Sequence, residues 1–277
     1  MSTCRLCGRD AGFFRWKHPA CRDKYKAGKQ KIVEIATSAF ASPTLDTSVP
    51  GQIDIVGRDS FVPVSERKLL ISRVWSDAVS RFLDDGIITQ DEEARLSAIQ
   101  QAYGLTQEDL DRDGAYSKLA KSAVIRDVLE GKIPKRITIA GTLPVNLQKG
   151  EVVVWLFRDA SYLEDKTRRE YVGGSSGVSF RVAKGVYYRI GSFRGHPIER
   201  TTRTHVDSGA VVVTSKNIYF TGPKKSLRVP YSKIVSFQPF SDGVGIIRDA
   251  QTAKPQIFVT GDGWFTYNLV TNLAQIA

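Results

Sequence analysis

Four residues near the N-terminus have the types and the spacing of a metal site. Cys4 and Cys7 are separated by two residues, and so are His18 and Cys21, which follow after a gap of ten. Both donor atoms of such a pair can reach one ion, so two pairs complete a tetrahedral shell and leave no position for substrate or water. The pattern predicts a structural zinc ion and disfavours a catalytic one.

A redox-active pair and a disulfide are the alternative interpretations of these cysteines. A redox pair requires neither His18 nor Cys21, and a disulfide framework prefers an even number of cysteines, whereas the chain contains three. About 30 residues cannot bury enough apolar surface to fold alone, so a metal ion would hold this segment together. The aromatic residues expected to form a small core around the ion are Phe13, Phe14, Trp16 and Tyr25.

The segment around these ligands is strongly basic. Residues 1–31 contain nine Lys and Arg against two Asp and Glu, and an apolar run begins at Ile32. We predict a helix from near Ala20 towards Ala36, with Gly28 as its weak point. Basic residues interleaved with aromatic ones are typical of nucleic-acid binding. The residues that would carry it are Arg15, Lys17, Arg22, Lys24, Lys26, Lys29 and Lys31.

Composition limits the class of the remaining chain. The 277 residues carry a net charge of +11 and an ordinary apolar fraction of 42%, so we expect a soluble protein of two or three domains. The sequence has no apolar run of a membrane-spanning length and no signal peptide, and its cysteines are confined to the metal pattern. These features predict a cytoplasmic protein. Basic ends can meet nucleic acid, anionic lipid or an acidic protein.

The chain is expected to be modular and of the α+β class. Residues 1–36 would form the zinc module with its basic helix, and residues 37–64, rich in Ser, Thr, Pro and Gly, would form a linker with one extended segment at Ile53–Val56. Apolar residues at helical spacing predict a helical module over residues 65–135, in which Thr89-x-x-Glu92 is a capping box.

One corner of the helical module resembles a known family. The sequence D-G-I-I-T-x-x-E over residues 85–92 is similar to the D-G-x-(I/V)-(S/T)-x-x-E corner of TerB-like helical modules of tellurite resistance. The resemblance covers about 40 residues. By analogy with the proteins in which such modules occur, the resemblance implies a sensor in bacterial stress response or phage defence.

Residues 143–277 change to a strand-like pattern. Short apolar runs alternate with turn residues such as Gly173-Gly174 and Gly222-Pro223, and the chain closes with an amphipathic helical pattern from Trp264 to Ile276. We predict a β barrel or sandwich capped by a C-terminal helix, which is the pleckstrin-homology (PH) layout. The strands are expected at Val152–Phe157, Val178–Val182, Val186–Ile190, Ala210–Val213, Asn217–Phe220, Leu227–Val229, Ile234–Pro239, Gly243–Arg248 and Gln256–Val259.

This part of the chain resembles the GRAM and bacterial PH-like domains. The similarity lies in Gly209–Gly222, in the following Leu227–Ile234, and in an opening L-x-x-G-E that ends at Glu151. Arg158–Tyr188 forms an insert relative to a minimal GRAM unit. The resemblance implies a basic hairpin loop that recognises anionic headgroups or protein partners. The residues that would do so are Lys224, Lys225 and Arg228, with Arg168 and Arg169 on the same rim.

The sequence offers little enzyme chemistry. No cysteine remains as a nucleophile, and Gly173–Gly177 fits neither a phosphate-binding P-loop nor a nucleophile elbow. We therefore expect a non-enzymatic, zinc-stabilised cytoplasmic adaptor or sensor, with a PH-like domain that binds a partner protein or an anionic membrane surface at the inner face of the membrane. The alternative is a nucleic-acid-binding protein that uses the basic zinc module.

Overall fold

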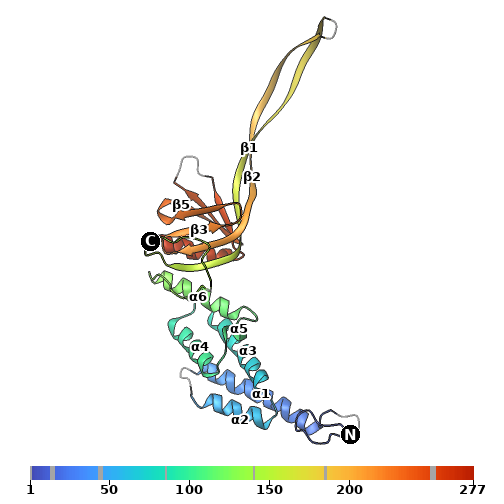
Figure 1. The fold of residues 1–277 in the computed structure, drawn as a ribbon, viewed down its shortest axis with the longest axis vertical. Coiled ribbons are helices and arrows are strands. Elements are labelled where there is room, and N and C mark those ends of the chain that lie inside the picture. Colours follow the sequence, from blue (N-terminus) through green and yellow to red (C-terminus); the bar gives the residue numbers. More distant parts are fainter. Residues whose placement is uncertain are drawn as a thin grey trace. The chain divides into compact units, whose positions relative to one another are not determined.

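The computed structural model describes residues 2–12, 16–42, 46–84, 86–139, 141–183, 186–249 and 254–277, with side chains described throughout these ranges except at 166–202. The chain divides into two compact units, a helical unit (Met1–Lys132) and a β unit (Ile133–Ala277) (Figure 1). The β unit contains a seven-stranded sheet, in which every pairing is antiparallel, and a C-terminal helix. The predicted combination of helices with an antiparallel sheet is confirmed.

The helical unit is built around one apolar core. Trp75 is completely buried and donates from Nε1 to the Leu96 carbonyl at 3.1 Å, while Ile32 and Phe40 bring the long first helix into the same core. The helices are α1 (Pro19–Ala41), α2 (Val49–Asp59), α3 (Val64–Phe82), α4 (Gln90–Ala102), α5 (Gln107–Leu110) and α6 (Ala115–Leu129).

The segment predicted as a linker carries regular structure. Helix α1 continues to Ala41, and the extended segment predicted at Ile53–Val56 is wrong because these residues lie within α2. A proline in the first turn of a helix loses no hydrogen bond, so the Val49-Pro50-Gly51 sequence begins this helix. Burial of Ile53 to 2% exposure then fixes α2 against the core.

Gly28 has a different role from the predicted weak point. A Cβ atom at this position would overlap the side chain of Ser60, and Gly28 itself is buried within α1. The absence of a side chain therefore permits close packing between α1 and the end of α2. An alanine here would require Ser60 to move.

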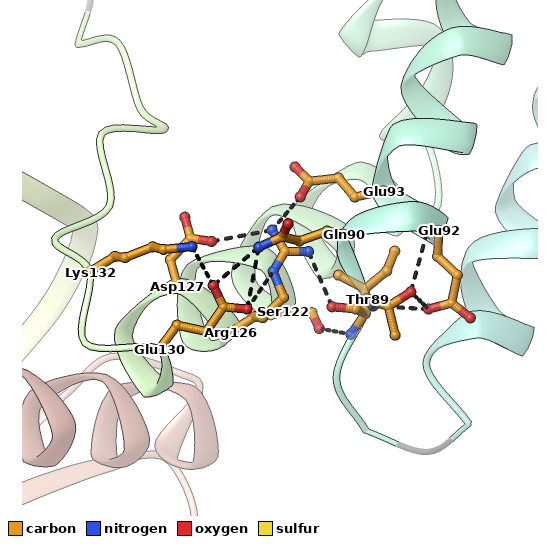
Figure 2. A network of polar contacts seen from close by, with 10 residues as sticks. Thr89, Gln90, Glu92, Glu93, Ser122, Arg126, Asp127, Glu130 and Lys132 are labelled. Atoms are coloured by element: carbon orange, nitrogen blue, oxygen red, sulfur yellow. Dashed lines mark hydrogen bonds and ion pairs between the residues drawn. The ribbon is translucent and has the colours of Figure 1, made fainter.

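The corner before α4 is fixed by hydrogen bonds from two sides. Thr89 and Glu92 form the predicted capping box on one side. On the other side, the main-chain N–H of Ile88 donates to Ser122 Oγ at 2.8 Å, and the Ile88 carbonyl accepts from Arg126 at 3.2 Å. A second capping box, with Thr106 as its N-cap, begins α5. Figure 2 shows the network at the corner before α4, in which the nearly buried Arg126 also meets acidic side chains of α4 and α6. The corner is thus held by α6.

The β unit consists of two meanders that share one sheet. The order β4-β3-β2-β1-β7-β6-β5 joins β1–β4 to β5–β7 through the pairing of β1 with β7. Helix α7 (Gly263–Ile276) packs on β5 and β6 and buries Phe265, whose ring lies 4.8 Å from that of Trp155. The strands are β1 (Val153–Ala183), β2 (Val186–Thr214), β3 (Asn217–Thr221), β4 (Ser226–Pro230), β5 (Ile234–Phe240), β6 (Gly243–Arg248) and β7 (Gln256–Val259).

Strands β1 and β2 are far longer than the sequence pattern suggests. The turn predicted at Gly173-Gly174 is wrong, because these residues lie within β1 and pair with Gly195 and Arg194. The predicted strands Val178–Val182 and Val186–Ile190 are the far ends of β1 and β2. Residues 166–183 of β1 and 186–202 of β2 together form what we call the ribbon, which continues beyond the other strands (Figure 1).

The start of β1 is anchored by a cluster of hydrogen bonds around Glu151. Its carboxylate accepts from Asn217 Nδ2 at 2.7 Å, from the Tyr219 hydroxyl at 2.7 Å, and from the Thr214 hydroxyl. It also accepts from the main-chain N–H of Gln148 at 2.7 Å. This glutamate ends the L-x-x-G-E motif, and its side-chain partners belong to the β2–β3 hairpin. The motif therefore ties the opening of the sheet to a hairpin more than sixty residues away.

Two glycines of the predicted GRAM-like motif allow backbones to approach closely. A Cβ atom on Gly209 would overlap the Thr221 carbonyl, and one on Gly222 would lie 2.5 Å from an Asp207 carboxylate oxygen. Both positions thus exclude larger side chains for steric reasons.

Candidate metal centre and basic surfaces

The four predicted ligands come together at one point. One donor atom of each of Cys4, Cys7, His18 and Cys21 lies within 4.8 Å of all the others, a group that could hold a metal ion. His18 Nδ1 lies 3.4 Å from Cys7 Sγ and 3.6 Å from Cys21 Sγ. Tetrahedral zinc with usual bond lengths would give a nitrogen–sulfur separation of about 3.6 Å. The donor set and its spacing therefore fit zinc.

The second ring nitrogen of His18 fixes the direction of the first. His18 Nε2 lies 2.8 Å from the main-chain carbonyl of Asp10, which can only accept, so Nε2 carries the proton and Nδ1 presents its lone pair to the thiols. This is the usual support of a metal-ligating histidine. The Asp10 carbonyl, followed by Cys7, raises the pKa of His18 above its ordinary value.

Two local structures create the spacing of the ligands. Cys4 and Cys7 lie in a tight turn, closed by the hydrogen bond from Gly8 N to the Cys4 carbonyl at 2.9 Å, with Gly8 at a φ of 73°. Residue His18 is the N-cap of α1, and Cys21 lies in the first turn of that helix. Pro19 starts the helix without loss of a hydrogen bond. A turn and a helix start thus each contribute one ligand pair.

The cysteine thiols have opposing tendencies to ionise. Hydrogen bonding, chiefly from the Cys7 main chain, lowers the pKa of Cys4 to about 6. Burial, followed by the neighbouring Cys7 and Cys4, raises the pKa of Cys21 to about 11. Three thiolates this close repel each other, so a bound cation is the group that would stabilise all of them.

Two of the four aromatic residues predicted to form a core around the ion, Trp16 and Tyr25, lie in the described part of the chain, and they do not form it. Trp16 is 61% exposed, with the Arg5 guanidinium 5.0 Å from its ring centre, and Tyr25 packs against the helical core and donates its hydroxyl to Glu66. Phe13 and Phe14 lie outside the described residues. Trp16 and Tyr25 therefore do not pack together around the ligands, which link the N-terminal turn to α1.

The basic residues of α1 do not form a single stripe. Arg22 and Lys26 are exposed one turn apart, whereas Lys24 and Lys31 lie on the other side of the buried face. Several are engaged with neighbouring side chains: Lys29 with Glu66 at 2.7 Å, Lys31 with Glu34 at 3.4 Å, Arg22 with Asp23 at 3.4 Å, Lys17 with the Tyr25 ring, and Lys24 with the Phe61 ring. Arg15 lies outside the described residues.

The turn between β3 and β4, Gly222–Ser226, which we call the lysine loop, is held by one buried carboxylate. Asp207 Oδ2 accepts from the main-chain N–H groups of Lys224 at 2.7 Å and Lys225 at 2.8 Å. Burial by itself raises the pKa of Asp207, but these bonds outweigh it and the net pKa is lowered. Sequence analysis assigned no role to this aspartate, which lies seventeen residues before Lys224.

The five predicted basic residues of the β unit do not lie together. Lys224, Lys225 and Arg228 are exposed at or beside the lysine loop, and Arg228 is opposite Tyr219 on β3. Arg168 and Arg169 belong to the ribbon, where they pair with Arg200 and Glu199, and their side chains lie outside the described ones. Arg168 is six residues along β1 from Tyr162, the partner of Asp207, a separation of about 20 Å in an extended strand.

Comparisons with known proteins add no relatives. No protein-family model, curated protein or solved structure matches this chain. The similarities to TerB-like modules and to GRAM domains therefore stay predictions. Among the described residues, no helix combines the length and apolar character needed to cross a membrane.

Proposed function

We propose that this protein is a non-enzymatic adaptor whose N-terminal segment is stapled by structural zinc. The closed ligand set carries this proposal. Cys4, Cys7, His18 and Cys21 offer four donor atoms within 4.8 Å of one another, which satisfies tetrahedral zinc. A catalytic zinc would need a position for substrate or water, and four protein ligands leave none.

The one arrangement in the described residues that is similar to a catalytic triad lacks its central contact. His205 Nε2 lies 3.0 Å from Ser208 Oγ, and Asp207 precedes Ser208 in the sequence. A triad requires that carboxylate on the other ring nitrogen of the histidine. The Asp207 oxygens accept instead from the main chain of Ser208, Lys224 and Lys225. This geometry favours binding over hydrolysis.

The β unit is the proposed recognition module, with a PH-like fold and the lysine loop as its binding edge. Lys224, Lys225 and Arg228 are exposed there, and each cation near an anionic leaflet is worth about 1 kcal/mol. The main-chain N–H groups of the loop are already engaged by Asp207, so the contact with a headgroup or an acidic protein would come from the side chains. Such binding would be reversible and salt-sensitive.

Co-sedimentation with vesicles tests the membrane form of this proposal. Full-length protein is expected to sediment with anionic vesicles and not with neutral ones, and Lys224→Ala with Lys225→Ala should abolish sedimentation. A matched control, Lys149→Ala with Lys233→Ala, removes the same charge from exposed positions of the same unit and should retain it. If no vesicles bind, the adaptor has a protein partner. If both variants fail equally, the lysine loop is not the binding edge.

A nucleic-acid-binding zinc module is the second candidate. Arg22 and Lys26 support it, since both are exposed one turn apart on α1. A basic surface of this kind would give affinity that falls steeply with salt. Arg22→Ala with Lys26→Ala should then weaken the binding of a DNA or RNA probe in fluorescence anisotropy. Unchanged affinity in this variant would exclude α1 as the binding surface.

A further inference from the structure

Within the part of the chain that the structure describes, the two strands of the ribbon pair only with each other. Its pairing runs from Lys166 with Thr202 to Ala183 with Val186. In contrast, β7 pairs with β1 at Ser161–Glu164, and β3 pairs with β2 at Ala210–Val213, both before the ribbon begins. Two strands alone gain little stability, so the ribbon is a candidate surface for binding a partner.

The charge of the ribbon indicates what kind of partner would fit. Residues 166–202 contain eight Lys and Arg against two Glu, together with five Tyr and Phe. The ribbon and residues 1–31 together exceed the net charge of +11 of the whole chain, so the remainder is slightly acidic. A segment this basic has a polyanion as its complementary partner.

The basic residues occupy positions on both faces of the ribbon. Paired residues share a face, and successive pairs alternate between faces. Arg168 and Arg200 form one pair, and Arg194 has the same parity in this register, whereas Arg169 and Arg189 fall on the opposite face. A flat membrane surface would contact only one face of the ribbon. A groove with phosphates along both sides would contact both faces.

Glycines give the middle of the ribbon an unusual freedom to bend. Gly173 pairs with Gly195, and Gly177 pairs with Gly191, so two levels of the same face have no side chain in either strand. Glycines within strands allow coiling and close approach of another backbone. This accounts for the glycine-rich sequence Gly173–Gly177, which no catalytic motif explained.

We propose that the ribbon binds double-stranded DNA by lying in the major groove. The groove is about 12 Å wide and admits a two-stranded ribbon, and the glycine-rich middle would let the ribbon follow its curvature. The major groove of an RNA duplex is too narrow for side chains to read, so DNA is preferred over RNA. This inference goes beyond the adaptor function and does not depend on the lysine loop.

A shortened variant tests the inference directly. Asp165 and Arg203 lie opposite each other, so an Asn-Gly turn between them can replace residues 166–202 and close a two-residue hairpin. The sheet pairings with β7 and β3 lie outside the deletion. The probe is a duplex DNA of about 30 base pairs, longer than the roughly 60 Å of the extended ribbon. Affinity should fall at least about tenfold, and the salt slope should become shallower.

A second pair of variants keeps the ribbon intact and separates its charge from the general charge of the unit. One variant replaces five ribbon residues by Gln: Lys166, Arg168, Arg189, Arg194 and Arg200. The matched control replaces five exposed basic residues of the β unit that lie outside both the ribbon and the lysine loop: Lys149, Lys216, Lys233, Arg248 and Lys254. The ribbon variant should lose most of the duplex affinity and the control little. Circular dichroism and thermal midpoints establish that both are folded.

Four results would overturn the inference. Duplex affinity could be unchanged in both ribbon variants, or the matched control could lose as much as the ribbon variant, or a duplex RNA could bind as tightly as the DNA. Arg22→Ala with Lys26→Ala is measured alongside, since DNA binding that depends on α1 alone would also contradict it. Loss of vesicle binding in the lysine-loop variant bears only on the adaptor proposal, so the two proposals fail separately.

Discussion

Each of the two units contains a cluster of converging polar groups near its first described elements. The two clusters differ in whether they require a bound ion to satisfy their polar atoms. At the N-terminus, Cys4, Cys7, His18 and Cys21 direct lone pairs towards a common point. At the start of β1, Glu151 directs its oxygens towards hydroxyl, amide and main-chain donors. Acceptors facing acceptors require a cation, whereas acceptors facing donors are complete. With the proposed zinc, the first cluster would depend on metal supply, whereas the second depends only on folding.

Removal of metal should give the largest effect. His18→Ala, or a strong chelator, is expected to release the proposed zinc and unfold the N-terminal turn, because the described aromatic residues Trp16 and Tyr25 form no core around the ligands that could replace the ion. Helix α1 should remain, since Ile32 and Phe40 hold it in the helical core. Metal content by mass spectrometry and amide exchange of residues 2–12 measure this. His18→Cys is the matched variant and should retain the metal, because four thiolates also bind zinc. Retained protection after complete metal loss would contradict the prediction.

Loss of Glu151 should be the next largest effect. Glu151→Ala leaves the nearly buried Asn217 and Tyr219 without their carboxylate partner, so we expect a loss of about 3 kcal/mol in the free energy of unfolding of the β unit. Glu151→Gln should cost less, because an amide oxygen still accepts. Chemical denaturation followed by Trp fluorescence measures both. Equal losses in the two variants would mean that size and not hydrogen bonding matters.

Acid should weaken the Glu151 cluster. Burial alone would raise the pKa of Glu151, but the bonds from Thr214, Asn217, the Gln148 main chain and Tyr219 outweigh it, and the net pKa lies below its usual value of 4.5. A lowered pKa means that the cluster contributes its full stability above the usual value and loses it as the pH falls through the lowered one. The Glu151→Gln variant should therefore show a shallower loss of stability below about pH 4.5. Parallel acid profiles would contradict this.

The sequence predicted best where the signals are local. The predicted capping box at Thr89 and each of the two ligand pairs depend on residues within one turn of each other. Helix α2 was missed because Val49-Pro50-Gly51 is also a turn sequence, and only the burial of Ile53 decides in favour of a helix.

Long-range partners left no local signal. The resemblance to GRAM domains marked Glu151 and Lys224, but Tyr219 and Asp207 are their partners across 68 and 17 residues. The length of β1 was missed for a related reason. Glycines that permit a turn also permit a bend inside a strand, and pairing with β2 determines which one forms.

A moderate loss of stability is expected at the lysine loop when its carboxylate, Asp207, is replaced. As in the Glu151 cluster, the hydrogen-bond donors to this carboxylate come from the protein itself. Asp207→Asn removes the charge that the N–H groups of Lys224 and Lys225 contact, and it should cost about 1–2 kcal/mol. Amide exchange at these two residues should increase. Ser208→Ala is the matched control, because the main-chain bond from residue 208 to Asp207 persists. Unchanged exchange in the Asp207 variant would show that β3–β4 pairing alone fixes the loop.

The smallest effects are expected at the two capping boxes. Thr89→Ala should lower the free energy of unfolding of the helical unit by about 1 kcal/mol, because it removes the side-chain acceptor of the Glu92 amide. Thr106→Ala acts on α5, which has only four residues, so we expect less than half that loss. Thermal denaturation compares them. A larger loss at Thr106 would show that α5 supports the core more than its length suggests.

The pairing of β1 with β7 has a consequence for synthesis on the ribosome. All four metal ligands have been made by residue 21, so the N-terminal turn can close while most of the chain is still absent. Strand β1 cannot complete its pairing until residues 256–259 have been made, about 100 residues after its own start. Contacts this distant in sequence form slowly, and until then the edge of β1 that receives β7 is open to other strands. We expect nascent chains truncated between the end of β1 and the start of β7 to aggregate, and those truncated between α6 and the start of β1 to remain in solution.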